Sequence, residues 1–261
     1  MFQLKKILFP VDFSRRARGA AAYVEALAGR FDAEVILLHV IEPAPYNRTL
    51  AEEPAITHQS FLEFFGPDLK YIRTGIVIER GEAAQKIVEC AVERKADLIM
   101  MPTQGLGVYR RLIIGSNVAK VLHDADCPVW TGVHMEEARP LEKMHTERVL
   151  CAVDLKRPSE RILNWASQLA KEYQAELTLL HVSPDRDASL CALEDLQKRV
   201  GSSAALRVKD GDPAKVVAET ARDINADLLV IGRRAEIGLL GRLEVTAYSI
   251  IRQSPCPVVS V

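Results

Sequence analysis

Two short apolar runs that end in Val-Asp decide the fold of this chain: Ile7-Leu8-Phe9-Pro10-Val11-Asp12 and Val149-Leu150-Cys151-Ala152-Val153-Asp154. Continuous apolar runs of this length are typical of strands that are buried on both faces. After the same interval, each run is followed by Leu-Leu-His-Val, at 37–40 and at 179–182. Each copy then has Ala-Asp-Leu, at 96–98 and 226–228, and ends on Cys-Pro-Val, at 127–129 and 256–258. A repeat of this length indicates two copies of a whole domain.

Within each copy, strand-like runs alternate with helix-like runs. In the first copy we expect strands over 7–11, 34–40, 75–79, 97–101 and 128–133, and helices over 14–30, 82–95 and 116–124. This alternation predicts parallel βαβ units and an α/β fold made of two tandem open, doubly wound parallel sheets. The charged segment 134–147 contains Pro140 and is interpreted as a surface linker. We therefore place the domains at 1–140 and 146–261.

One stretch of the first copy, from 42 to 71, is irregular. It holds four prolines, at 43, 45, 54 and 67, together with Phe61, Phe64 and Phe65. We expect a loop followed by a short amphipathic helix. The segment is either a flap over a site or a loop whose phenylalanines cover the sheet.

Composition excludes several classes of function. The chain has 261 residues, a net charge of −1 and 48% hydrophobic residues, which is ordinary for a globular protein. No face or tail concentrates Lys and Arg, so no nucleic-acid partner is expected. No apolar stretch approaches the length of a membrane span, so no membrane partner is expected. Five cysteines without a Cys-x-x-Cys pair favour a reducing compartment over a disulfide framework or zinc site. We expect a cytoplasmic protein without a metal site.

The segment from Met101 to Asn117 carries the candidate chemistry. It contains Gly105, and Gly115-Ser116 opens the helix expected over 116–124. Glycines allow backbone N–H groups to approach an anion, and a helix N-terminus adds partial positive charge. Asp12 would face the same crevice from the end of the first strand, where its carboxylate suits a ribose hydroxyl. The alternatives are a loop in which Ser116 only caps a helix, and a carboxylate that only satisfies a turn.

General nucleotide motifs are absent from the sequence, since it has no Gly-Lys pair and no third glycine after Gly105-x-Gly107. However, the chain resembles the universal stress protein family in its tandem two-domain form. The family motif is Gly-x-x-Gly, nine residues, then Gly-Ser or Gly-Thr, and Gly105, 106–114 and Gly115-Ser116 match it. Pro102 replaces the first glycine. Val11-Asp12-Phe13-Ser14, Leu38-His39-Val40 and the Asp126-Cys127-Pro128-Val129 ending also match.

The resemblance implies a sheet of strand order 3-2-1-4-5 in each domain, with ATP, with or without Mg²⁺, across strands one and four. It implies these binding residues: Pro10, Val11, Asp12, Phe13, Ser14, Val40, Met101, Pro102, Gly105, Gly115, Ser116 and Asn117. It also implies that the last strands, Val129–Val133 and Val258–Val261, pair the domains as an intrachain pseudo-dimer with pseudo-two-fold symmetry. A homodimer is the alternative assembly.

The second copy departs from the motif. Gly232 keeps the first glycine, but Ala235 and Val245 replace the next two, and Lys156 replaces Ser14. A β-branched valine resists positive φ and narrows the approach to the helix end. We therefore expect the second domain to bind ATP poorly or not at all. It serves either as a structural partner or as a repurposed pocket.

Three functions remain open. The first is a stress-response regulatory protein that binds an adenine nucleotide and acts through a protein partner. The second is a slow ATPase or self-phosphorylating protein that uses Ser116 or a neighbouring residue, although the sequence offers no evident catalytic base. The third is an interaction module without nucleotide, favoured if Pro102 closes the site. His39 and His181 lie in apolar strands and are interpreted as hydrogen-bonded core residues.

Overall fold

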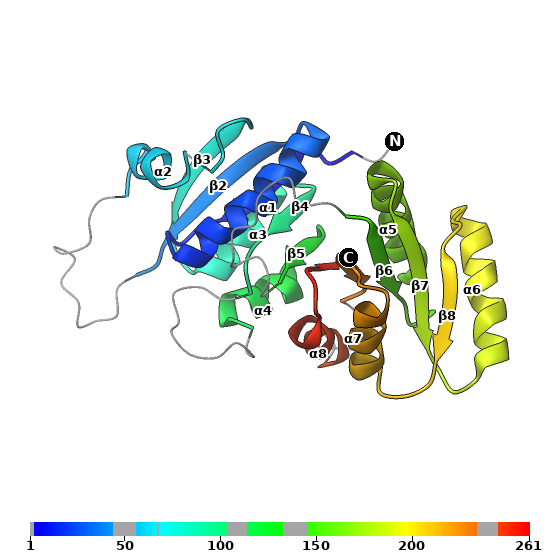
Figure 1. The fold of residues 1–261 in the computed structure, drawn as a ribbon. Helices are drawn as coiled ribbons and strands as arrows, with labels where there is room; N and C mark the ends of the chain where they lie inside the picture. Colours follow the sequence, from blue (N-terminus) through cyan, green and yellow to red (C-terminus); the bar gives the residue numbers. More distant parts are fainter. Residues whose placement is uncertain (1–2, 44–55, 67, 104–113, 133–145, 234–244) are drawn as a thin grey trace. The chain divides into compact units, whose positions relative to one another are not determined.

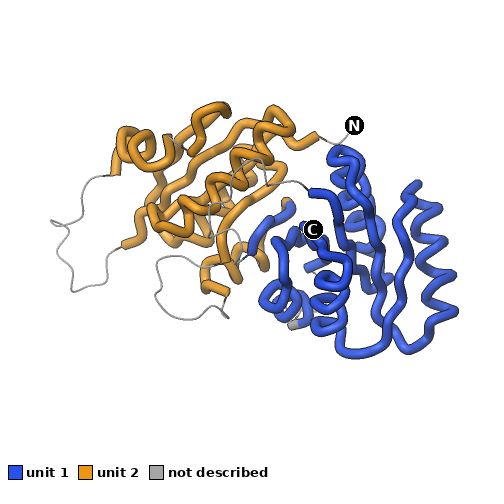
Figure 2. Tube along the Cα trace, in the orientation of Figure 1, with its two compact units in different colours: residues 1–2, 128–134, 145–261 blue, residues 3–127, 135–144 orange. Residues whose placement is uncertain are grey.

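The computed structural model describes residues 3–43, 56–66, 68–103, 114–132, 146–233 and 245–261. The chain divides into two compact units (Figure 2). The N-terminal unit, orange in Figure 2, comprises the described residues up to 127. The C-terminal unit, drawn in blue, comprises the described residues from 128 onward.

The N-terminal unit alternates strands and helices, as the sequence predicts (Figure 1). Its strands pair in the order β3-β2-β1-β4, and all are parallel. The predicted helix over 116–124 is α4 with the same bounds, and the predicted short helix of the 42–71 stretch is α2. The elements are β1 (Lys6–Pro10), α1 (Arg15–Phe31), β2 (Glu34–Ile41), α2 (His58–Phe65), β3 (Thr74–Arg80), α3 (Ala83–Glu93), β4 (Leu98–Met100) and α4 (Ser116–Asp124).

The C-terminal unit shows the complete topology of the repeat. Its parallel strands follow the order β8-β7-β6-β9-β10, which is the predicted order 3-2-1-4-5. All four residues of β9 are buried, as expected for a parallel strand covered by helices on both faces. The elements are β5 (Val129–Thr131), β6 (Arg148–Ala152), α5 (Ser159–Tyr173), β7 (Glu176–Val182), α6 (Arg186–Val200), β8 (Ala205–Lys209), α7 (Pro213–Asp223), β9 (Leu228–Ile231), α8 (Val245–Gln253) and β10 (Val258–Ser260).

The repeat extends to the backbone conformation. The residue after each Val-Asp run is left-handed, with φ of 56° at Phe13 and 62° at Leu155. Asp32 and Gln174, which end α1 and α5, have φ of 49° and 55°. Left-handed backbone is costly for non-glycine residues, so its recurrence at equivalent positions means that the fold imposes it.

The Ala-Asp-Leu motif has a structural role. Asp97 Oδ2 accepts hydrogen bonds from the N–H groups of Lys5 and Lys6, at 2.8 and 2.9 Å. Asp227 Oδ2 accepts the same pair of bonds from Glu147 and Arg148, both at 2.9 Å. Each aspartate therefore fixes the start of its central strand to the start of the neighbouring strand.

The last strands of the two copies pair, as predicted. β5 and β10 are antiparallel, with Trp130 opposite Val259 and Val129 opposite Ser260. Trp130 and Val259 occupy equivalent places in the repeat, so equivalent residue pairs lie on either side of this central pair. The pairing covers an apolar strand edge that would otherwise be open to other chains. Among the described residues, no helix is long and apolar enough to span a bilayer.

Candidate functional site

The carboxyl end of β1 presents the first group of predicted site residues. Val11 N–H donates to the Leu38 carbonyl at 2.8 Å, which holds the chain beside β2 just after the strand ends. Asp12 Oδ1 accepts a hydrogen bond from Ser14 N–H at 3.0 Å. Ser14 Oγ in turn accepts from Ala17 N–H at 3.1 Å and caps α1. Asp12 thus satisfies a turn, which was one of the two expectations for this carboxylate.

Phe13 leaves this turn and packs into an aromatic cluster. Its ring centroid lies 5.0 Å from that of Phe61 and 5.5 Å from that of Phe64. Phe61 and Phe65 of α2 are fully buried. The phenylalanines of the irregular stretch therefore cover the end of the sheet, as one of the two expectations had it. Sequence reasoning did not identify Phe13 as the residue they pack against.

His39 is a hydrogen-bonded histidine of the core edge, as predicted. Its Nδ1 lies 2.8 Å from the Val11 carbonyl, and the His181 Nδ1 lies 2.8 Å from the Val153 carbonyl. A carbonyl only accepts, so Nδ1 carries the proton in both rings. The Leu-Leu-His-Val repeat thus ties the second strand to the chain after the first strand.

The second group of predicted site residues follows β4. Met101 and Pro102 are buried, and Gly115 N–H donates to the Thr103 carbonyl at 2.8 Å. The Thr103 side chain is 1% exposed, and its hydroxyl has no hydrogen-bond partner among the described residues. Ser116 then opens α4, whose N-cap is Gly115 without any capping side chain. Gly105 lies outside the described residues.

Gly115 does not have the positive φ that the sequence analysis assumed at this position of the motif. Gly115 has φ −59° and ψ 150°, an extended conformation that any residue adopts. Positive φ therefore gives no reason why Val245 could not take this place. The expected difference between Gly115 and Val245 is therefore steric, because a glycine N-cap leaves the first N–H groups of α4 accessible to a ligand.

The two groups converge on one edge of the sheet. β1 lies between β2 and β4, with Ile7 opposite both Val35 and Leu98. The chain leaves β1 toward β2 and later returns on the other side, so strand order reverses between β1 and β4. In open α/β sheets, ligands bind outside the carboxyl ends of the strands at such a point. Val40, half-buried near the end of β2, lies at the same edge.

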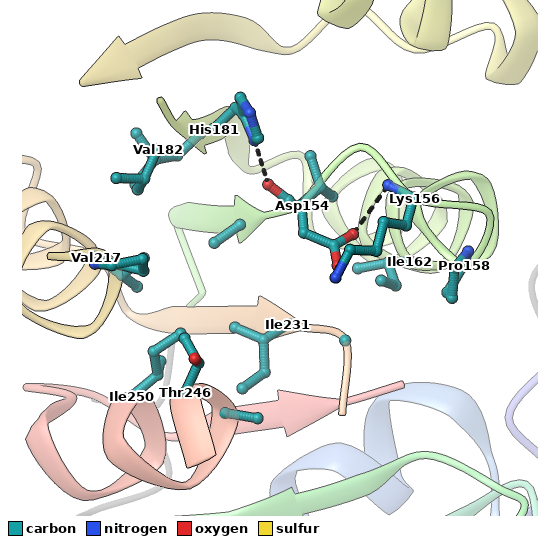
Figure 3. A pocket seen from close by; sticks show the side chains of 16 residues that line it. Asp154, Lys156, Pro158, Ile162, His181, Val182, Val217, Ile231, Thr246 and Ile250 are labelled. Carbon is teal, nitrogen blue, oxygen red and sulfur yellow. Dashed lines mark hydrogen bonds and ion pairs between the residues drawn. The ribbon is translucent and has the colours of Figure 1, made fainter. Parts of the chain in front are cut away.

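The C-terminal unit has a cavity of about 470 Å³ at the equivalent edge, which we call the C-terminal cavity (Figure 3). Nine of its lining residues are the repeat equivalents of predicted site residues. They are Ala152, Val153, Asp154, Lys156, Val182, Ile231, Gly232, Thr246 and Ala247. Sequence reasoning identified the positions but not the cavity, because a hollow depends on side-chain volumes across several elements.

Asp154 is more fully bound than Asp12. Its Oδ1 accepts from Lys156 N–H at 3.0 Å and from Ser159 Oγ at 3.4 Å. Its Oδ2 lies 3.3 Å from Lys156 Nζ (Figure 3). Lys156, which stands where the first copy has Ser14, thus neutralises the charge of Asp154.

Among the described residues, no three His, Cys, Asp or Glu side chains gather as metal ligands. Burial raises the pKa of Cys151 far above its usual range and that of Cys256 to about 11, so both remain protonated thiols at neutral pH.

Comparison with known proteins agrees with this architecture. The Universal stress protein family matches residues 3–131, 145–199 and 187–261. A universal stress protein of Methanocaldococcus jannaschii is 34% identical over 135 residues, covering 48% of this chain and 79% of its own length. One of Mycolicibacterium smegmatis is 25% identical over 290 residues, covering 98% of this chain and 96% of its own.

A solved structure extends the likeness to the whole chain. The crystal structure of a universal stress protein from Archaeoglobus fulgidus is 25% identical, with a TM-score of 0.78. The match covers 99% of this chain and 98% of that one. With both copies matched by the family and the fold shared over its full length, this chain belongs to the universal stress protein family, in a tandem form.

Proposed function

We propose that this chain is a stress-response regulatory protein that binds ATP, with or without Mg²⁺, in its N-terminal unit. Binding would change its contacts with a protein partner. The observation that carries the proposal is the start of α4, where Gly115 provides no capping side chain. Unsatisfied N–H groups and the helix dipole together form an anion site, and a phosphate supplies the missing acceptors.

Two further features fit a nucleotide at this edge. Asp12 Oδ1 accepts from Ser14 N–H, and the other oxygen of this carboxylate would accept from a ribose hydroxyl. The buried Thr103 hydroxyl lacks a partner among the described residues, and an unmade hydrogen bond there costs about 1–3 kcal/mol. A ligand group that reaches Thr103 would recover this energy.

Pro102 is compatible with the proposal. At the equivalent place in the C-terminal unit, a Cβ on Gly232 would approach Ile162 Cδ1 to 2.6 Å. The N-terminal copy has the small residue Ala20 where the C-terminal copy has Ile162, and this leaves room for the proline ring. Pro102 lacks an N–H, but the anion site proposed here uses the N–H groups of α4.

Self-phosphorylation at Ser116 is the second candidate function. The Ser116 side chain is exposed at the uncapped start of α4, where a bound phosphate would lie. A single-turnover assay with ATP, comparing the wild type with Ser116→Ala, separates this reaction from binding alone.

The cytoplasm is the location we propose. All five cysteines are free, which suits a reducing compartment.

Calorimetric titration with ATP and Mg²⁺ tests the proposal. Asp12→Asn should weaken binding by about tenfold to a hundredfold, the value of a hydrogen bond to a charged group. Asp154→Asn, the same change at the repeat-equivalent position, is the matched control and should alter ATP affinity less than about twofold. Absence of binding by the wild type at millimolar ATP would refute the proposal.

A further inference from the structure

The C-terminal cavity is a built pocket in a unit that lacks two of the three motif glycines. Its volume of about 470 Å³ lies in the range of small-molecule sites, roughly 300–1,000 Å³. It opens where β6, β7 and β9 end, between residues of α5, α7 and α8 (Figure 3). The pocket is thus too large for one or two waters and is placed where this fold binds ligands.

The wall of the cavity is predominantly apolar. Branched side chains from five different elements and from the segment after β6 line it: Val153, Ile162, Val182, Val217, Ile231 and Ile250. Apolar walls favour a ligand with an apolar body, because burial of that body removes its surface from water.

The charged groups of the cavity neutralise each other. Lys156 Nζ lies 3.3 Å from Asp154 Oδ2, and these are the only fully charged side chains among the residues that line the cavity in the described part of the chain. A polyphosphate would place several negative charges beside a carboxylate and against apolar walls, with one lysine already engaged. Burying charge without pairing is strongly unfavourable, so the wall selects against phosphorylated ligands.

The remaining polar capacity is mainly that of an acceptor. His181 donates its Nδ1–H to the Val153 carbonyl, which leaves Nε2 as an acceptor in the neutral ring. The Asp154 carboxylate already accepts from Lys156 (Figure 3). A hydroxyl or amino group on the ligand supplies a donor for His181 Nε2.

We propose that the C-terminal cavity binds an uncharged, mostly apolar small molecule that carries a hydroxyl or amino group. The site is distinct from the nucleotide site proposed in the N-terminal unit and does not depend on it. One chain would then bind two chemically different ligands, a charged one at the start of α4 and a neutral one beside His181.

Titration of the full chain with 2-naphthol and 2-naphthyl phosphate tests the proposed class. The two probes share one ring system and differ in the phosphate. The naphthol should bind saturably with one equivalent per chain, and the phosphate at least about tenfold more weakly, because of its unpaired charge. Equal or tighter binding of the phosphate would mean that Lys156 and the start of α8 set the preference, and would overturn the assignment.

A pair of repeat-equivalent variants locates the binding. Val182 is half-buried and lines the C-terminal cavity, so Val182→Trp should fill the space that the ligand needs. The affinity for 2-naphthol should fall by at least about tenfold. Val40→Trp makes the same change in the N-terminal unit and should leave the naphthol titration at one equivalent. Circular dichroism confirms that each variant is folded.

Three further results would overturn the proposal: no saturable binding of 2-naphthol by the wild type, loss of naphthol binding in Val40→Trp, or its persistence in folded Val182→Trp. None of these depends on whether ATP binds. Failure of the ATP titration with retention of the naphthol site would refute only the nucleotide proposal.

Discussion

Gly232→Ala tests a difference in packing between the two copies of the repeat, at the carboxyl ends of their strands. A Cβ at Gly232 would lie 2.6 Å from Ile162 Cδ1 and 3.7 Å from Ile162 Cγ1. The first distance is a clash and the second is an ordinary contact. Since Cδ1 is the far end of the side chain, the isoleucine can shift, and it shifts at the wall of the C-terminal cavity.

The magnitude follows from two opposing effects. Overpacking costs about 1–3 kcal/mol, and the low end applies where a flexible atom can move. Replacing glycine by alanine gains about 0.4–1 kcal/mol by restricting the unfolded chain. The single variant should therefore be destabilised by about 1 kcal/mol or less. Ile162→Val removes Cδ1 and keeps Cγ1, so in that background Gly232→Ala should stabilise by about 0.4–1 kcal/mol.

A double-mutant cycle by urea unfolding measures the change of sign. The unfolding free energies of the wild type, Gly232→Ala, Ile162→Val and the double variant are compared, with one common dependence on urea concentration fitted to all four proteins. If Gly232→Ala changes the unfolding free energy equally in both backgrounds, Ile162 is not the reason why position 232 is a glycine. The inference that Ala20 makes room for the Pro102 ring would then lose its support.

Three further predictions follow from described contacts. Pro102→Gly should change ATP affinity less than about threefold, measured by calorimetry, because the anion site uses the N–H groups of α4; a large gain would show that the proline obstructs the site. Asp97→Asn and Asp227→Asn should each cost about 1–2 kcal/mol of unfolding free energy, since each carboxylate accepts two backbone N–H groups, and unequal losses would contradict the shared role. Burial raises the pKa of Cys256 from 9.0 to about 11, so its contribution to stability is present below pH 9.0 and is lost as pH rises toward 11; Cys256→Ala should show a smaller loss over this range in unfolding titrations, and an unchanged loss would assign it to other groups.

The fold was largely predictable because its signals are local and occur twice. Val-Asp, Leu-Leu-His-Val and Cys-Pro-Val mark the strands, and the helix of 116–124 was predicted with its observed bounds. The pairing of β5 with β10 was also expected, from the resemblance and from the need to cover an apolar edge. Local periodicity and turn chemistry decide such features.

The details of the site were less accessible. The packing of Phe13 against α2 is a long-range contact, and so is the hydrogen bond from Gly115 N–H to the Thr103 carbonyl. The C-terminal cavity is lined by side chains that lie far apart in the sequence, among them Asp154, Ile162 and Thr246. No short sequence motif encodes such a combination.

Equilibrium dialysis of the full chain at saturating ATP tests the central claim most directly. The account predicts one equivalent per chain, reduced to none by Gly115→Val, because a branched side chain at the N-cap would cover the first N–H groups of α4. A plateau near two equivalents would show that the C-terminal cavity accepts the triphosphate. No binding, or a plateau unaffected by Gly115→Val, would contradict the assignment of the nucleotide to the start of α4.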